Sequence, residues 1–129
     1  MSEQYFNGLK YEWCNFAYVI DFNLSDRRKR VRANLMGIEC DDLVLNFVHT
    51  CCQTFMRSKR FREDEMKMIT SEKSELLYFD IRQKDGLKFL FIHARPKNTH
   101  PSEAYYDYQE AAMLSSAVSL CLKYMTAAK

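Results

Sequence analysis

Glycine and proline are scarce in this chain, which has only three glycines and two prolines among its 129 residues. Sandwiches and barrels of β-strands use both residue types in their many turns, so the scarcity argues against an all-β architecture. Uninterrupted apolar runs are short, and none could span a bilayer. The first residues, Met1–Gln4, have neither a basic start nor an apolar core and predict no secretory signal. We therefore expect an intracellular protein, in the cytoplasm or the nucleus, with no membrane contact.

Patterns typical of disulfide and metal frameworks are also missing. The chain has five cysteines, and an odd count without small-scaffold spacing argues against a disulfide framework. Reduced thiols fit an intracellular compartment. His49, Cys51 and Cys52 are close in the sequence, but a zinc site takes four ligands, often as spaced pairs, and no second pair exists here. We expect no metal ion and no cofactor.

Apolar side chains are plentiful. Hydrophobic residues make up 47% and aromatic residues 14% of the sequence, which is enough for a folded core and unlike the composition of a disordered chain. The length suits one domain, which we expect to span residues 1–129, with residues 1–9 as a loose lead-in.

Four segments in the first part of the chain carry the period of a strand or a helix. Aromatic and β-branched residues predict a strand over residues 10–22. Alternation predicts a second strand over residues 30–38, after a basic turn; a helix starting near Ser25 is the alternative. Residues 41–57 predict a helix, because apolar residues recur at helical spacing behind two capping aspartates. Residues 65–71 predict another short strand.

The strongest local pattern is a hairpin. Two runs that alternate between apolar and other residues, 77–81 and 87–91, flank an Asp-Gly pair typical of hairpin turns. We expect a three-residue loop with Gly86 in the left-handed conformation, because a two-residue turn would mix Phe89 and Phe91 with the charged side chains of Asp80 and Arg82. The expected register places six apolar residues on one face: Leu77, Phe79, Ile81, Leu87, Phe89 and Phe91.

A long helix is predicted at the end of the chain, over residues 102–127, with Pro101 suited to its first turn. Its apolar stripe consists of Ala104, Tyr108, Ala111, Leu114, Val118, Cys121 and Met125. The expected order of elements is thus β-β-α-β-β-β-α. The economical arrangement is an α+β fold, with a single antiparallel sheet of four to five strands and two main helices packed on it.

Positive charge is concentrated in two clusters. Residues 26–62 hold nine basic and four acidic side chains, a net charge of +5, whereas the whole chain carries +2. Seven of the nine are arginines, which can bind phosphates and carboxylates with two parallel hydrogen bonds. We expect both clusters to lie on one side of the molecule and to bind a partner. The clusters are Arg27, Arg28, Lys29, Arg30 and Arg32, and Arg57, Lys59, Arg60 and Arg62.

The two clusters favour a non-catalytic interaction domain that binds the acidic surface of another protein, with Phe61, Tyr105 and Tyr106 as aromatic contacts. One alternative is a nucleic-acid-binding module that uses the same clusters, although an RNP1 strand and a zinc knuckle are absent. Another is that both clusters are solvated ends of elements without a partner. A small enzyme with scattered catalytic residues is a further alternative, and no phosphate-binding loop, nucleophile elbow or H-E-x-x-H motif points to it.

Overall fold

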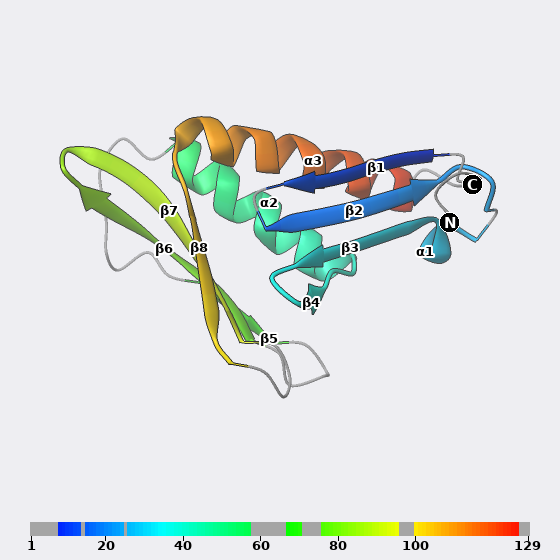
Figure 1. Cartoon of the computed structure of the whole chain (residues 1–129), viewed down its shortest axis with the longest axis horizontal. Helices are drawn as coiled ribbons and strands as arrows, with labels where there is room; N and C mark the ends of the chain where they lie inside the picture. Colours follow the sequence, from blue (N-terminus) through cyan, green and yellow to red (C-terminus); the bar gives the residue numbers. More distant parts are fainter. Residues whose placement is uncertain are drawn as a thin grey trace.

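The computed structural model describes residues 8–13, 15–24, 26–57, 67–70, 76–95 and 100–126, and describes no side chains for residues 8–13, 27, 28, 67–70, 76 and 126. Within these residues the chain runs twice through the same order, a set of strands followed by a long helix (Figure 1). The first half comprises β1 (Gly8–Trp13), β2 (Phe16–Asp21), the short helix α1 (Arg27–Arg30), β3 (Val31–Leu35), β4 (Ile38–Glu39) and α2 (Asp42–Arg57). The second half comprises β5 (Lys67–Thr70), β6 (Leu76–Lys84), β7 (Leu87–Arg95), β8 (Ser102–Tyr106) and α3 (Tyr108–Thr126).

The described strands form two separate antiparallel sheets, each in sequential order. Sheet A has the order β1-β2-β3-β4 and sheet B has the order β5-β6-β7-β8. The expected α+β class with antiparallel strands and two main helices is therefore confirmed, but the expected single sheet is wrong. The reason is that α2 intervenes between β4 and β5, and β5 pairs with β6 instead of extending the first sheet.

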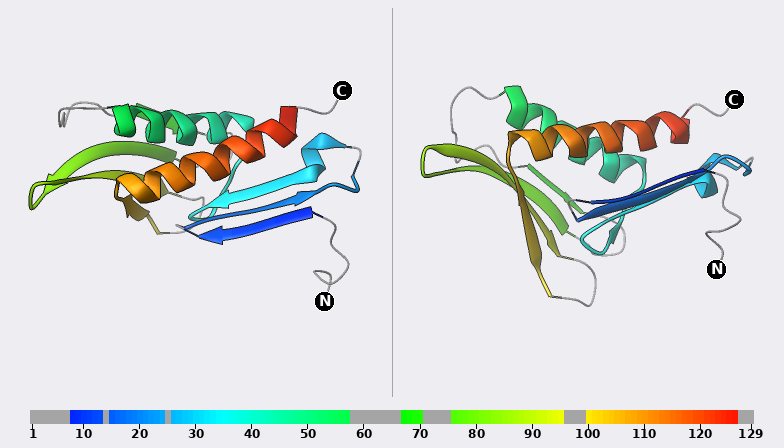
Figure 2. Two further views of the ribbon diagram at one scale, coloured as in Figure 1. Left: turned by 90° about the horizontal axis from the view of Figure 1, so that it is seen from above. Right: turned by 45° about the horizontal axis from the view of Figure 1, so that its top comes forward.

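The two long helices lie side by side, and both sheets pack against them (Figure 2). Helix α3 contacts β2 and β3 of sheet A as well as β7 and β8 of sheet B, whereas α2 contacts β7. No described helix is both long enough and apolar enough to cross a membrane. The core between these layers includes fully buried side chains from every layer: Phe16, Ile20, Leu35, Leu45, Phe55, Phe79, Leu90, Ile92, Leu114 and Val118.

Helix α2 agrees closely with the expected helix over residues 41–57. Asp41 caps it, since the Val44 amide donates a 2.9 Å hydrogen bond to the Asp41 carboxylate. Arg57, in the last turn, has the sign of charge that suits the carbonyl end of a helix. Its buried face consists of Val44, Leu45, Val48, Cys51, Cys52 and Phe55.

The first predicted strand, over residues 10–22, is in fact the hairpin of β1 and β2. The turn contains Asn15 with a φ of 63°, a left-handed conformation that asparagine tolerates better than most residues, and Trp13 pairs with Phe16 across it. The second predicted strand is confirmed over Val31–Leu35 only. The preceding basic residues form α1 instead of a turn, because the Lys29 and Arg30 amides both donate to the carbonyl of Asp26. The expected strand over 65–71 is confirmed over Lys67–Thr70, which form β5, and its other residues lie outside the described residues.

The predicted start of the last helix is wrong by six residues, because residues 102–106 form the strand β8. A reciprocal capping pair sets the true start of α3. The Glu110 amide donates to the Asp107 carboxylate at 2.7 Å, and the Asp107 amide donates to the Glu110 carboxylate at 3.0 Å. Ala104 therefore lies in β8 and not on the helix stripe, and Tyr108 is 60% exposed instead of facing the core.

The turn between β6 and β7 has two residues, so the expected three-residue loop is wrong. Asp85 and Gly86 both have positive φ, 54° and 79°, as a type I′ turn requires. The left-handed Gly86 is confirmed, but Lys84 pairs directly with Leu87. Since a shift of one residue exchanges the two faces of a strand, Phe89 and Phe91 lie on the face opposite to Leu77, Phe79 and Ile81. Their places on the buried face are taken by Leu90, Ile92 and Ala94.

Candidate functional site

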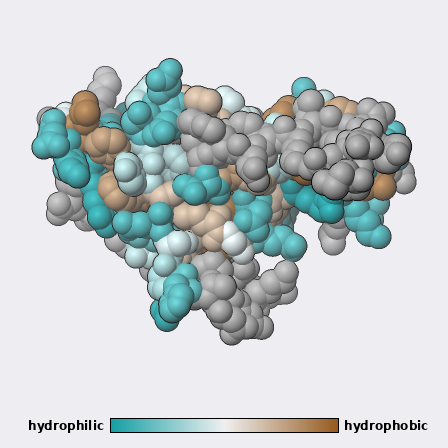
Figure 3. All heavy atoms as spheres, in the orientation of Figure 1, coloured by the Kyte–Doolittle hydropathy of each residue, from teal (hydrophilic) through white to brown (hydrophobic). Residues whose placement is uncertain are grey.

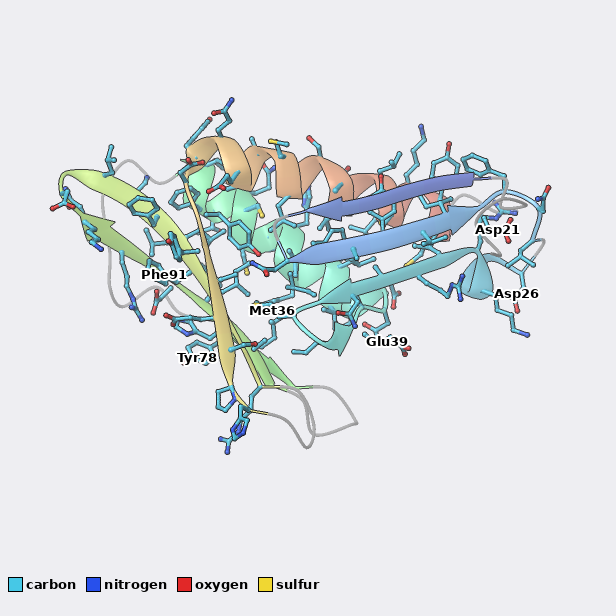
Figure 4. All side chains as sticks on the ribbon, viewed as in Figure 1. Asp21, Asp26, Met36, Glu39, Tyr78 and Phe91 are labelled. Atoms are coloured by element: carbon cyan, nitrogen blue, oxygen red, sulfur yellow. The ribbon has the colours of Figure 1, made fainter. Side chains whose placement is uncertain are left out.

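Sheet B has an outer face, which we define as the side turned away from α2 and α3. Alternate residues of a strand face opposite sides of a sheet. On β6, β7 and β8 the residues that do not face outwards are buried on the side of the helices. Figure 4 shows Tyr78 and Phe91 projecting on the outer side. The outer-face side chains form cross-strand rows: Tyr78, His93 and Glu103; Asp80, Phe91 and Tyr105; and Arg82 with Phe89.

Aromatic rings stack across the strands of this face. The Tyr78 and His93 rings lie 4.5 Å apart with an angle of 8° between their planes. The Phe91 and Tyr105 rings lie 5.5 Å apart at 25°, and Phe89 meets the edge of Tyr105 at 6.0 Å. Such pairs add to stability beyond the area that they bury. The ladder ends at the solvent, because Tyr105 is 63% exposed.

Arg82 and His93 lie against the two carboxylates of the outer face, those of Asp80 and Glu103. Arg82 donates from Nε and Nη2 to the two oxygens of Asp80, at 3.1 and 3.2 Å. The same guanidinium lies 4.4 Å from the Phe91 ring centroid, a cation–π distance. His93 has Nδ1 3.1 Å from a Glu103 oxygen and Nε2 3.4 Å from an Asp80 oxygen. Its buried Nε2 makes no hydrogen bond in the structure, since the Asp80 oxygens are oriented towards Arg82.

Two further cations lie at the ends of the outer face. Lys84 precedes the β6–β7 turn and Arg95 ends β7, and alternation along each strand places both on the outer side. Both side chains are exposed and neither pairs with a carboxylate of the described residues. Since the two carboxylates of the face are already engaged within it, the charge left for a partner is positive.

A shallow pocket of about 320 Å³ opens at one end of this face, lined by Tyr78, His93, Arg95, Pro101, Ser102 and Glu103, with Ala94 at its side. The surface over sheet B in Figure 3 interleaves apolar and polar patches. No hydroxyl or thiol of the described residues forms a hydrogen bond with His93, so the face holds no described pair of nucleophile and base. No described group of histidine, cysteine and carboxylate side chains is arranged to hold a metal ion.

The structure separates the described parts of the two basic clusters. Arg27–Arg30 form α1, which contacts α3 and lies near the end of α3 in Figure 1. Arg57 ends α2 near the start of α3, where Gln53 donates to Ser115 at 3.0 Å. Helix α3 has 19 residues and is roughly 28 Å long, so Arg57 does not lie next to α1 as expected. Lys59, Arg60, Phe61 and Arg62 lie outside the described residues.

The aromatic contacts expected on the last segment differ in orientation. Tyr105 is exposed on the outer face of sheet B, as a contact residue has to be. Tyr106 is 1% exposed and belongs to the core, so its expected role as a partner contact is wrong. The reason is that both residues lie on a strand, where neighbouring side chains face opposite sides.

The expected site did not include Tyr78, Phe89, Phe91 or His93. The signal for them was present in the sequence, because a two-residue Asp-Gly turn places Phe89 and Phe91 opposite Arg82 and Asp80. No family model matches the chain and no curated protein is found to match it.

Proposed function

We propose that this protein is a non-catalytic interaction domain that binds an acidic segment of another protein on the outer face of sheet B. The observation that carries the proposal is the exposed end of the aromatic ladder, Tyr105, beside an arginine that is already fixed by Asp80 and Phe91. Tyrosine and arginine are enriched at protein interfaces and among the residues that contribute most to binding. Arg82 is held in place before the partner arrives, which lowers the entropy lost on binding.

The stacking geometry favours a protein over a nucleic acid at this face. A base binds to an aromatic side chain by covering the open face of its ring. Here the faces of Tyr78 and His93, and those of Phe91 and Tyr105, are turned towards each other, and Arg82 lies over Phe91. At the exposed end of the ladder, Tyr105 offers a ring with a polar tip, a combination that is common at protein interfaces.

Charge complementarity favours an acidic partner. Arg82, Lys84 and Arg95 lie along the face, whereas Asp80 is paired with Arg82 and Glu103 lies against His93. A segment with aspartate or glutamate would meet cations at both ends of the face and apolar rings between them. Helix α1 and the start of β3 lie at the other end of the molecule, away from this face (Figure 1).

We also propose that the domain works inside the cell. The four described cysteines are buried and none is in a disulfide bond: Cys40, Cys51, Cys52 and Cys121. Thiols persist in this state in the reducing cytoplasm and nucleus.

A peptide-display selection on the folded protein tests the proposal. We expect the selected peptides to be enriched in aspartate and glutamate, and to lose about 2 kcal/mol of binding free energy, roughly thirtyfold, with Tyr105→Ala. Tyr108→Ala is the matched control, since Tyr108 is also exposed, at 60%, but lies on α3. Basic or uncharged consensus peptides, or peptides that bind the Tyr105→Ala and Tyr108→Ala variants equally well, would refute the proposal.

A further inference from the structure

The turn after β2 exposes two large apolar side chains. Phe22 is 41% exposed and Leu24 is 37% exposed. The turn is nevertheless well held, because the Asn23 amide donates to the Asp21 carboxylate at 2.9 Å. The Arg30 guanidinium donates two hydrogen bonds to the Leu24 carbonyl, at 3.1 and 2.7 Å. The exposure of Phe22 and Leu24 is therefore a fixed feature of this surface and not the result of a frayed end.

The Arg-rich segment is attached to the same turn. Helix α1 starts after Asp26, and both Lys29 and Arg32 are exposed. From α3, the exposed Lys123 lies with Nζ 5.9 Å from the Tyr124 ring, and that ring lies 5.3 Å from Phe22. We name this patch the basic tip: Asp21, Phe22, Leu24, Asp26, Arg27–Arg30, Arg32, Lys123 and Tyr124. Four basic side chains of this patch are described, those of Lys29, Arg30, Arg32 and Lys123, and the backbone of α1 places Arg27 and Arg28 beside them in the chain. Its two acidic residues are Asp26 and Asp21, and Asp21 accepts the hydrogen bond that holds the turn.

We infer that the basic tip binds single-stranded nucleic acid. Arginine and lysine neutralise backbone phosphates, and five of the six basic residues of the tip come from one short stretch of the sequence, residues 27–32. An exposed aromatic ring beside such a stretch provides the second element of single-strand binding, a surface on which an unpaired base can stack. This function goes beyond the protein contact proposed for sheet B and uses residues at the opposite end of the molecule (Figure 2).

The geometry of Phe22 distinguishes this tip from the ladder on sheet B. Its one described ring neighbour is Tyr124, and the two planes are tilted by 47°, so no described ring is stacked parallel to Phe22. On sheet B, by contrast, the planes of the Tyr78 and His93 rings differ by 8° and those of Phe91 and Tyr105 by 25°, so the rings of each pair are stacked. A patch that only served an acidic protein would need the cations but not an open ring. The exposed Phe22 ring, with no described ring stacked parallel to it, is what favours unpaired bases over an acidic protein.

Fluorescence anisotropy with a labelled oligothymidylate tests the inference on the full chain. We expect binding to weaken as salt rises. A plot of the logarithm of the binding constant against the logarithm of the salt concentration should fall with a slope of about 0.7 per phosphate contacted. In the double variant Lys29→Glu with Arg32→Glu, this slope should be smaller by about 1.4. Phe22→Ala should weaken binding about fivefold or more, the loss expected for one base stacked on a ring. The matched control is Lys84→Glu with Arg95→Glu, which makes the same charge change on sheet B and should bind as the wild type does.

Three outcomes would overturn the inference. The first is that the wild-type chain fails to bind the oligonucleotide in low salt. The second is that polyglutamate displaces the labelled oligonucleotide as well as unlabelled oligothymidylate does, while Phe22→Ala leaves binding unchanged. That result would assign the tip to an acidic protein. The third is that a DNA duplex binds as tightly as the single strand. Thermal melting of each variant shows that it is folded, and Tyr105→Ala, which tests the sheet B proposal, should leave oligonucleotide binding unchanged.

Discussion

Replacing Gly86 by alanine tests the turn that sets the register of sheet B. Gly86 has a φ of 79°, and a Cβ added there would meet no atom within 4 Å. The cost is therefore purely conformational, about 1–2 kcal/mol for a side chain in the left-handed region. Alanine also restricts the unfolded chain, which returns about 0.4–1 kcal/mol. The middles of these two ranges give a net loss of unfolding free energy of about 0.8 kcal/mol. Valine, which is β-branched, should lose more.

Urea and thermal denaturation followed by circular dichroism measure this loss. For a chain of this size it corresponds to a fall in melting temperature of about 2–7 °C. Gly86→Asn is the control. Asparagine adopts positive φ more readily than alanine does, so this variant should lose less stability. If Gly86→Ala were as stable as the wild type, Gly86 would not have positive φ. The pairing of Lys84 with Leu87, and with it the outward placement of Phe89 and Phe91, would then be wrong.

Three further predictions concern buried side chains. Burial raises the pKa of the Cys121 thiol to about 12. This thiol should therefore resist iodoacetamide in the folded protein and react after unfolding. Peptide mass spectrometry measures the labelling, and fast labelling of the folded chain would contradict this prediction. Burial, with a smaller contribution from Cys121, also raises the pKa of Tyr18. Both groups keep their protons in the folded chain when the unfolded chain has lost them, so the free energy of unfolding should fall as pH rises from the ordinary thiol pKa of 9.0 towards 12. A urea titration with a flat or rising profile over this range would exclude that linkage. Tyr106→Ala should cost about 3–5 kcal/mol, as for other large core side chains. Tyr105→Ala removes ring contacts with Phe89 and Phe91 at the surface and should cost less, about 0.5–1.5 kcal/mol. Equal losses in denaturation would show that β8 is oriented differently.

Elements with purely local signals could be predicted from the sequence. Helix α2 depends on the Asp41 cap and on one apolar face, both within the segment itself. The start of α3 was missed because two local signals competed. Pro101 favoured an early start, and the pairing of Asp107 with Glu110 set the true one. The partition of the strands into two sheets has no local signal, since it depends on which distant strands pair.

The candidate site was missed for a related reason. A single choice, the number of residues in the turn at Gly86, decides which face every residue of β7 occupies. The contacts of His93 with Asp80 and Glu103 follow from that register and are invisible in any one segment. The basic clusters were evident from composition alone, but composition carries no information on whether Arg57 lies near α1.

The exchange of contacts between the two halves has a consequence for how the chain folds. Helix α2 belongs to the first half but packs on β7 of the second, and α3 packs on β2 and β3 of the first half as well as on β7 and β8 of its own. The bond from Gln53 to Ser115 joins residues 62 positions apart. Because each half packs against the other's elements, we expect the two to fold together, and the closure of such long loops makes folding slow. At high concentration during refolding, the same exchange made between two chains would close a domain-swapped dimer with the native contacts.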